Sequence, residues 1–293
     1  MTDSSWTSWP APAKLNLFLH IVGRRSDGYH LLQTVFQLLD FGDTVYLRPR
    51  QDGALVRIGE LPGVSLRNDL CLRAAHLLQK HTGCRLGADI AIDKIIPIGG
   101  GLGGGSSDAA SVLVGLNALW DTGLDNDALV ALGLQLGADI PLFIHGDSAW
   151  AEGVGEILTP IELPERQPYV ILDPQVIVPT QEMFQAPELT RNLSRITIDG
   201  FNAGAATKNV FESVVRTRYA PVSAALDWLN QFGAARLSGS GGCIFVAVPT
   251  PEEAAAVARQ CPDWMFPYLA RGINRSPLRN AVAMFAAGTS PSW

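Results

Sequence analysis

Alternating apolar and polar positions predict several strands along this chain of 293 residues. The alternation is clear over 14–22, 43–50 and 88–93, each a short run bounded by proline, glycine or charged residues, which is typical of strands. Two apolar runs in the second half, 168–174 and 235–248, also predict strands. The chain therefore has a substantial β component in both halves.

A different spacing predicts helices between these strands. Apolar residues recur with helical period over 69–83, and residues 108–120 are apolar nearly all round, as in a helix that is buried on most faces. A helix is also predicted from Pro251, since Thr250 supplies an N-cap and Glu253 a capping box. Strands and helices are mixed without strict βαβ alternation, so we expect an α+β protein.

The organisation of the chain suggests two lobes. A proline-rich stretch at 160–168 separates the halves, and we expect an N-terminal lobe over 1–155 and a C-terminal lobe over 156–293. Residues 1–10 are mainly polar and carry two tryptophans, so we expect them to form a loose tail.

Composition and charge exclude several classes of protein. With 47% apolar and 17% charged residues the chain is typical of a globular protein. A net charge of -6 and the lack of basic runs argue against nucleic acid or a membrane surface as the main partner. Residues 1–14 have neither the basic nor the apolar region expected of a signal peptide, and no run of about 18 apolar residues occurs, so we expect a cytoplasmic protein. Four scattered cysteines without C-x-x-C spacing predict no metal cage or disulfide framework.

The most unusual stretch is 99–105, where six of seven residues are glycine. Each glycine inside a helix or strand costs roughly 0.5–1 kcal/mol relative to alanine, so this is a loop for close backbone approach. Its free N–H groups lead directly into a helix N-terminus, where Ser106 and Ser107 add hydroxyls. This arrangement suits a phosphate group, whereas a flexible linker would not be flanked by apolar residues and a buried helix.

Other phosphate-binding motifs fit poorly. Gly99, Gly101 and Gly104 match G-x-G-x-x-G, but no βαβ unit surrounds them to support a dinucleotide site. A P-loop needs lysine after its last glycine, where this chain has Ser106. The Asp-Phe-Gly triplet at 40–42 lies upstream of the loop without an H-R-D motif before it, so a protein kinase is rejected.

Three segments resemble the GHMP kinases: the strand at 12–21, the glycine loop with its paired serines at 97–110, and the glycine motif at 236–248. Within the family, 24–37 and 136–143 look most like the branch that phosphorylates 4-diphosphocytidyl-2-C-methyl-D-erythritol (CDP-methylerythritol). The resemblance implies the two-lobed GHMP kinase fold, with an ATP-binding N-terminal lobe like domain 2 of ribosomal protein S5 and a C-terminal lobe that contributes to the substrate site. The implied reaction phosphorylates the 2-hydroxyl, on the non-mevalonate route to isoprenoids.

The resemblance also implies a reaction centre. Asp139 matches the residue that accepts the hydroxyl proton and Lys14 the catalytic lysine, whose charge would keep that carboxylate ionised and face the phosphate. Asn16, on the same strand face as Lys14, would hydrogen-bond the hydroxyl or phosphate. Without the resemblance, Asp139 could be a turn or helix-terminal aspartate and Lys14 a solvated lysine.

The acceptor is expected on another set of residues. Tyr29 and His30 match the pair that stacks on and hydrogen-bonds cytosine, with Phe184 on the opposite side of the ring, and Thr180 is a further match. Ordinary core packing is the alternative for Phe184. Backbone N–H groups of the third motif would meet the diphosphate, unless the motif is only a tight strand-to-helix turn: Gly239, Ser240 and Gly241.

The nucleotide ATP is expected at the glycine loop. Its base and ribose would lie near Asn68 and Lys94, although exposed residues of these types are common in loops. Mg²⁺ would arrive with ATP, and Ser107 is the only protein ligand that the sequence suggests. The expected phosphate-binding residues run from 97 to 107: Pro97, Ile98, Gly99, Gly100, Gly101, Leu102, Gly103, Gly104, Gly105, Ser106 and Ser107.

One segment departs from the pattern and leaves alternatives open. At 207–214 the family branch commonly has an Asn-Asp pair, but Val210 stands in place of the aspartate, so the role of this segment is open.

Another GHMP kinase, such as a homoserine or mevalonate kinase, is the near alternative to the implied function, and Tyr29 with His30 argues against it. A nucleotide-binding protein without turnover would have no need of both Lys14 and Asp139. A dinucleotide-dependent oxidoreductase is the most distant alternative.

Overall fold

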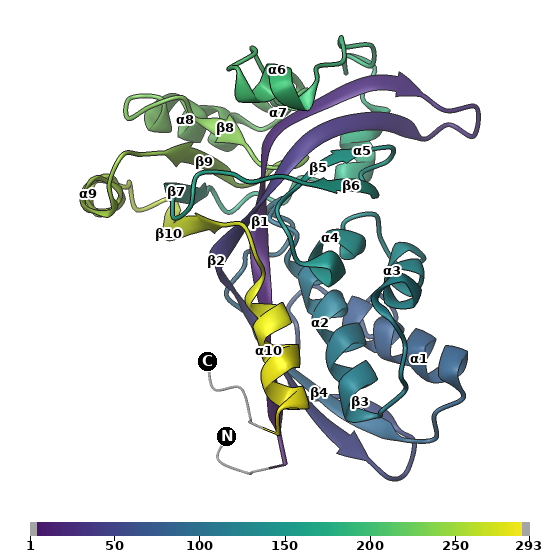
Figure 1. Cartoon of the computed structure of the whole chain (residues 1–293). Helices are drawn as coiled ribbons and strands as arrows, with labels where there is room; N and C mark the ends of the chain where they lie inside the picture. The colour runs from purple at the N-terminus through teal and green to yellow at the C-terminus, as the bar shows by residue number, and fades with distance from the viewer. Residues whose placement is uncertain (1–4, 289–293) are drawn as a thin grey trace.

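Two long antiparallel strands form the axis of the molecule. The computed structural model describes residues 5–288, and in it β1 (Thr7–Arg24) pairs with β2 (His30–Arg50) along nearly its whole length. Both strands run from one lobe into the other (Figure 1). The register of the pair shifts between Pro12 and Lys14, between Asn16 and Leu19 and between Ile21 and Gly23, as at β-bulges.

The first lobe is built on the lower part of these strands. β4 (Gly87–Asp93) pairs with β2, and β3 (Leu55–Arg57) runs parallel to β4. The buried core here includes Trp9, Leu47, Leu113 and Phe143. Four helices pack against the strands: α1 (Leu70–Thr82), α2 (Gly104–Leu119), α3 (Asn126–Leu134) and α4 (Ile140–His145).

The second lobe continues the same sheet, in the order β3-β4-β2-β10-β7-β9-β8. The remaining strands are β5 (Ala149–Glu152), β6 (Ile157–Pro160), β7 (Pro168–Asp173), β8 (Arg236–Leu237), β9 (Ile244–Ala247) and β10 (Phe266–Ile273). The helices that follow along the chain are α5 (Thr180–Gln185), α6 (Ile198–Asn202), α7 (Glu212–Arg218), α8 (Ala220–Leu229) and α9 (Pro251–Arg259).

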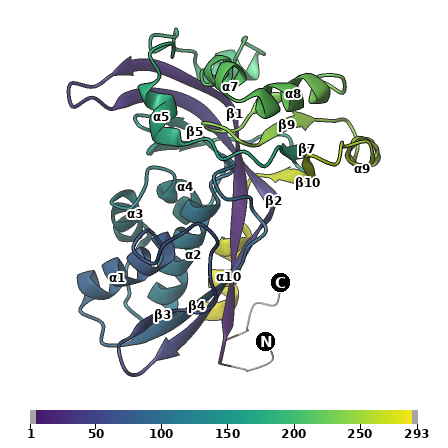
Figure 2. The same ribbon diagram turned by 180° about the vertical axis from the view of Figure 1, so that it is seen from behind.

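The last helix returns to the first lobe. α10 (Pro277–Ala286) lies beside the lower part of β1 in both views (Figures 1 and 2), and the Phe285 ring is 5.5 Å from that of Trp9. The end of the chain thus helps to bury the core of the N-terminal lobe. The lobe boundary near residue 155 stays a prediction, and the structure adds that 277–286 pack on the N-terminal side of it.

The sequence patterns located most elements correctly, and the α+β two-lobed fold is confirmed. Asp69 caps α1, since its carboxylate accepts from Cys71 N at 2.8 Å, and Thr250 caps α9. The prediction that residues 1–10 form a loose tail was wrong for those that the structure describes, because β1 begins at Thr7 and Trp9 is fully buried. Among residues 5–288, no helix has both the length and the apolar character needed to span a membrane.

Candidate active site

The glycine loop at 97–103 connects the region after β4 to α2, as expected. Gly101 and Gly103 have φ of +77° and +76°, a conformation that favours glycine. A Cβ at Gly101 would also lie 2.2 Å from the Ser238 carbonyl oxygen, so this glycine is needed for the contact between the two lobes. The loop is therefore a packed structure and not a flexible linker.

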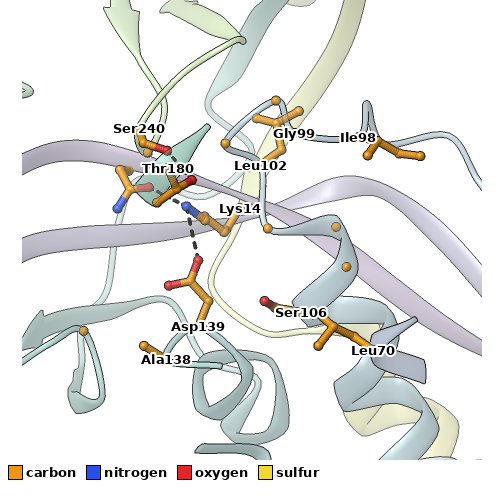
Figure 3. Close-up of a pocket in the computed structure, with 18 of the residues that line it drawn as sticks. Lys14, Leu70, Ile98, Gly99, Leu102, Ser106, Ala138, Asp139, Thr180 and Ser240 are labelled. Carbon is orange, nitrogen blue, oxygen red and sulfur yellow. Dashed lines mark hydrogen bonds and ion pairs between the residues drawn. The ribbon is translucent and has the colours of Figure 1, made fainter. Parts of the chain in front are cut away.

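A cavity of about 590 Å³ lies between this loop, β1, the start of α4 and the second lobe (Figure 3). The structure brings most of the predicted site residues to its wall. Those residues are Lys14, Asn16, Asn68, Lys94, Pro97, Ile98, Gly99, Gly100, Gly101, Leu102, Gly103, Gly104, Gly105, Ser106, Asp139, Thr180, Phe184, Gly239 and Ser240.

Lys14 and Asp139 face each other in this cavity. Lys14 Nζ is 3.6 Å from Asp139 Oδ2 and donates to Asn16 Oδ1, and Asn16 Nδ2 in turn donates to Thr34 Oγ1 at 2.9 Å. Lys14 is on β1, whereas Asp139 immediately precedes α4, and Figure 3 shows their charged groups pointing toward one another. The Asp139 side chain does not cap α4, so a purely capping role has no support.

Burial and charge set the chemistry of this pair. The Lys14 side chain is only 4% exposed, whereas that of Asp139 is 34% exposed. Burial lowers the pKa of Lys14, and the carboxylate of Asp139 opposes that shift. A reachable carboxylate beside a buried ammonium can accept a proton while the ammonium stabilises negative charge.

Lys94 lies beneath the start of α2, held by two carboxylates. Its ammonium pairs with Asp43 and with Asp108 Oδ2, the latter at 2.8 Å, and a Cβ at Gly104 would lie 2.8 Å from Lys94 Nζ. Burial opposes the charge on Lys94, but Asp108 and Asp43 raise its pKa overall. Sequence reasoning missed both carboxylates, although an aspartate within the apolar helix pattern at 108–120 was a signal that a partner was needed.

Ser107 does not reach the cavity. Its side chain is fully buried, and its Oγ has no hydrogen-bond partner among the described residues. The neighbouring Ser106 lines the cavity instead. The structure therefore separates the two serines that the sequence placed together at the helix start.

The residues expected to bind cytosine lie at a second, adjoining cavity of about 730 Å³. Tyr29, which is 64% exposed, and His30 line this cavity, and Phe184 lines both cavities. The Phe184 ring stacks directly on His30, with centroids 5.2 Å apart and planes at 22°. Phe184 was expected on the opposite side of the cytosine ring from Tyr29 and His30, and this placement stays a prediction; in this conformation its ring contacts His30 directly.

The third motif, at 238–242, joins strands β8 and β9 and holds the glycine loop. Ser238 Oγ donates to Gly101 O at 3.0 Å and Cys243 N donates to Gly100 O at 3.0 Å. Ser240 Oγ lies 2.7 Å from Thr180 Oγ1. The alternative interpretation of this motif, as a tight turn between a strand and a helix, was wrong, because the elements on both sides of it are strands. Gly241, unlike Gly239 and Ser240, does not line the cavity.

The structure also explains the segment that departs from the family pattern. Asn209 Nδ2 donates to Leu237 O at 2.9 Å and to Gly239 O at 2.7 Å, and its Oδ1 accepts from Phe211 N at 2.9 Å. Val210 is buried in the apolar core of the second lobe. Asn209 therefore anchors the third motif, a role that the sequence alone did not reveal.

Comparison with protein families places this geometry in context. Residues 69–147 match the description "GHMP kinases N terminal domain", and residues 189–265 match "GHMP kinases C terminal". The first match contains the glycine loop and Asp139, and the second contains Asn209 and the third motif. Both segments that match the GHMP kinase domains therefore contain residues that line or support the cavity.

Individual relatives are similar over nearly the whole chain. A Xylella fastidiosa protein named 4-diphosphocytidyl-2-C-methyl-D-erythritol kinase is 57% identical over 278 residues, covering 94% of this chain and 93% of the relative. A protein of the same name from Aromatoleum aromaticum is 54% identical, covering 93% of this chain and 95% of the relative.

Solved structures give the same picture of the fold. A crystal structure of 4-(cytidine 5'-diphospho)-2C-methyl-D-erythritol kinase superposes with a TM-score of 0.77 at 33% identity, covering 90% of this chain and 98% of the other. A homoserine kinase from Cytophaga hutchinsonii superposes with a TM-score of 0.70, covering 94% and 97% of the two chains. At 15% identity, the second comparison bears on the fold alone.

Proposed function

The chain belongs to the GHMP kinase family, and from that premise we propose that it transfers the γ-phosphoryl group of ATP to the 2-hydroxyl of CDP-methylerythritol. The reaction belongs to the methylerythritol phosphate route to isoprenoids. The observation that carries the proposal is the Lys14–Asp139 pair, 3.6 Å apart in a cavity walled by the glycine loop. High identity to relatives named for this reaction supports the choice of acceptor.

The residues of the cavity suit phosphoryl transfer, which needs positioning and charge stabilisation more than covalent chemistry. Asp139 would accept the proton of the attacking hydroxyl, because its carboxylate is the exposed member of the pair. Lys14 would stabilise charge on the transferred group, and Asn16 holds the lysine ammonium in place. Backbone N–H groups of the glycine loop and the start of α2 would bind the phosphates.

Mg²⁺ would be held mainly by ATP phosphates and water, which this ion prefers to an all-protein cage. The donor set fits this mode, since the described part of the chain contains no group of three or more His, Cys, Asp or Glu side chains arranged to hold a metal. The buried Ser107 hydroxyl lies outside the cavity wall. When bound, Mg²⁺ neutralises phosphate charge.

The remaining assignments follow from the two cavities. We assign the nucleotide to the first, with Asn68 and Lys94 on its wall, and the cytidine end of the acceptor to the second, with Tyr29 and His30. Residues 1–155 would then supply most of the ATP site, and 156–293 would complete the acceptor site. A cytoplasmic location and the absence of a nucleic-acid partner stay predictions.

The test is ADP release from ATP with CDP-methylerythritol as the acceptor, with the position of the new phosphate determined by ³¹P NMR. Homoserine and mevalonate serve as competing acceptors, and Asp139→Asn controls for contaminating kinases. We expect turnover only with the cytidine compound. Turnover with homoserine or mevalonate instead would assign the chain to another branch of the family, and tight ATP binding without any turnover would make it a non-catalytic binder.

A further inference from the structure

Arg191 connects the second cavity to the helix beside it. Its Nε donates to His30 Nε2 at 3.1 Å, and its Nη1 donates to Leu189 O at 2.9 Å. Its Nη2 donates to Phe184 O at 3.1 Å and to Ala186 O at 2.6 Å. The guanidinium is thus fixed by three carbonyl groups, one in the last turn of α5 and two in the segment that follows it, and presents one N–H to the imidazole.

This contact determines which ring nitrogen of His30 carries the proton. An arginine side chain has only donors, so His30 Nε2 must accept, and the proton of the neutral ring is on Nδ1. The Phe184 ring stacked on the imidazole holds its plane. Burial, with the charges of Arg191 and Arg24, lowers the pKa of His30 and keeps the ring neutral near pH 7.

We propose that Arg191 fixes His30 as an Nδ1–H donor and thereby makes the enzyme prefer a cytosine base to a uracil base. The proposal rests on the function proposed above, in which the cytidine end of the acceptor occupies the cavity lined by His30. Arg191 acts through His30, so it is a positioning residue and not a catalytic one.

The chemistry of the two bases gives the preference its direction. Cytosine presents an unprotonated N3 that accepts a hydrogen bond, whereas uracil presents an N3–H donor at the same position. A fixed Nδ1–H of His30 therefore donates to cytosine N3. With uracil the same Nδ1–H would face the N3–H, so two donors would meet and no hydrogen bond would form. An unmade hydrogen bond at a desolvated donor costs about 10- to 100-fold in affinity.

Without Arg191, either imidazole nitrogen is free to carry the proton. His30 could then accept from uracil N3–H through an unprotonated Nδ1, and the penalty against uracil would fall. Arg191 lines the second cavity but not the first, so its loss should leave ATP binding unchanged.

The first test measures the tautomer in the wild-type protein without substrate. Long-range ¹H–¹⁵N NMR at pH 7.5 distinguishes protonated from unprotonated ring nitrogens, and His30→Gln identifies the signals among the five histidines of the chain. We expect the proton on Nδ1. A proton on Nε2 would overturn the proposal, and this result requires neither a folded Arg191 variant nor any turnover.

The second test compares kcat/KM for CDP-methylerythritol and its uridine analogue. We expect wild-type protein to favour the cytidine compound by about 10- to 100-fold and Arg191→Met to reduce that ratio to a few-fold, with KM for ATP unchanged. Arg195→Met is the matched control, because Arg195 is an exposed arginine of the same loop that pairs with Glu152, and it should keep the wild-type ratio.

A second variant separates the tautomer from folding. Arg191→Gln offers an amide that can donate or accept, so it permits both tautomers and should also lose discrimination if Arg191→Met does not fold. Unchanged discrimination in a folded Arg191 variant would overturn the proposal. Absence of any transfer to CDP-methylerythritol in wild-type protein would instead contradict the proposed function, while the tautomer measurement still decides whether Arg191 fixes the ring.

Discussion

The ammonium of Lys14 lies 3.6 Å from the carboxylate of Asp139, and only the carboxylate is substantially exposed. β1 supplies the lysine and the residue before α4 supplies the aspartate, so the pair depends on packing between elements that are distant in sequence. Burial lowers the pKa of the lysine, which makes its charged form dependent on its acidic neighbour.

Asp139→Asn should abolish most activity with little effect on stability. The amide keeps the shape of the side chain but does not accept the hydroxyl proton, and general-base assistance contributes roughly 10²–10⁴-fold. We expect kcat to fall by at least about 10²-fold, with ATP affinity changed far less. Melting temperature and kcat are measured on one preparation. A destabilised variant with nearly normal kcat would contradict the assignment, because it would mean that Asp139 is structural.

Gly105→Ala tests the close approach of phosphate to the backbone without disturbing the protein. A Cβ at Gly105 would meet only Leu70 Cδ1, at 3.6 Å, which is ordinary contact. Alanine in a helix is favoured over glycine by about 1 kcal/mol, so the melting temperature should rise or stay constant. ATP affinity should fall about 10- to 100-fold if the methyl group displaces one phosphate hydrogen bond.

Calorimetric titration of ATP measures this effect, with Gly23→Ala as a control on β1, where an added Cβ also meets ordinary contacts. Gly103→Val is less informative, because its Cβ would lie 2.8 Å from Phe143 Cζ at a φ of +76°. Equal ATP affinity in wild-type and Gly105→Ala proteins would show that phosphate does not approach this turn of α2.

The KM for the cytidine substrate should rise as the pH falls below about 6.5. Burial, Arg191 and Arg24 lower the pKa of His30 beneath that ordinary value, so the ring is neutral above it and gains a proton only in more acid solution. A proton on Nε2 would then face the Arg191 guanidinium. Asp27 lines the same cavity but pairs with Arg25 at 2.7 Å.

The lowered pKa of His30 also makes the stability of the protein depend on pH. Because the native pKa is the lower one, the unfolded chain takes up the proton first, and the native state loses stability as the pH falls through about 6.5. KM and melting temperature are measured from pH 5 to pH 8 on wild-type protein and His30→Gln. An identical rise of KM in His30→Gln would attribute the effect to another group.

Local sequence signals predicted the elements that local physics determines. The α1 helix could be located because Asp69 caps it and Gly83, with φ of +69°, ends it, and glycine density alone marked the phosphate loop. Trp9 was misassigned to a loose tail because its burial depends on pairing with Val45 across the sheet and on the ring of Phe285 near the end of the chain. No local pattern contains those contacts.

The candidate site shows the same division. Resemblance to the GHMP kinases pointed to Lys14 and Asp139, whose contact requires the fold to bring β1 and α4 together. Arg191 carried no signal, because an arginine in a polar loop is ordinary until its bond to His30 is seen. Asp43 was missed for a similar reason, since its partner Lys94 lies on a distant segment.

Asn209→Ala should weaken both folding and acceptor binding, because Asn209 anchors the third motif. The substitution leaves the carbonyls of Leu237 and Gly239 and the N–H of Phe211 without their partners in a buried region, and we expect a loss of about 2–4 kcal/mol in the free energy of unfolding. Gly239 and Ser240 line the first cavity, where we expect the third motif to bind the diphosphate of the acceptor, so KM for CDP-methylerythritol should rise several-fold.

Val210→Ala is the matched control, because Val210 is the next residue, is equally buried and packs its side chain in the apolar core of the second lobe. Removing two methyl groups should cost about 1.5–3 kcal/mol in stability while leaving the bonds of Asn209 intact. Urea denaturation gives the stability of each variant, and initial rates well below the transition give KM for the folded fraction. If both variants lose stability and both keep the wild-type KM, Asn209 stabilises the lobe without positioning the third motif for the acceptor. A raised KM confined to Asn209→Ala would mean that its two donated hydrogen bonds hold Gly239 where the acceptor binds.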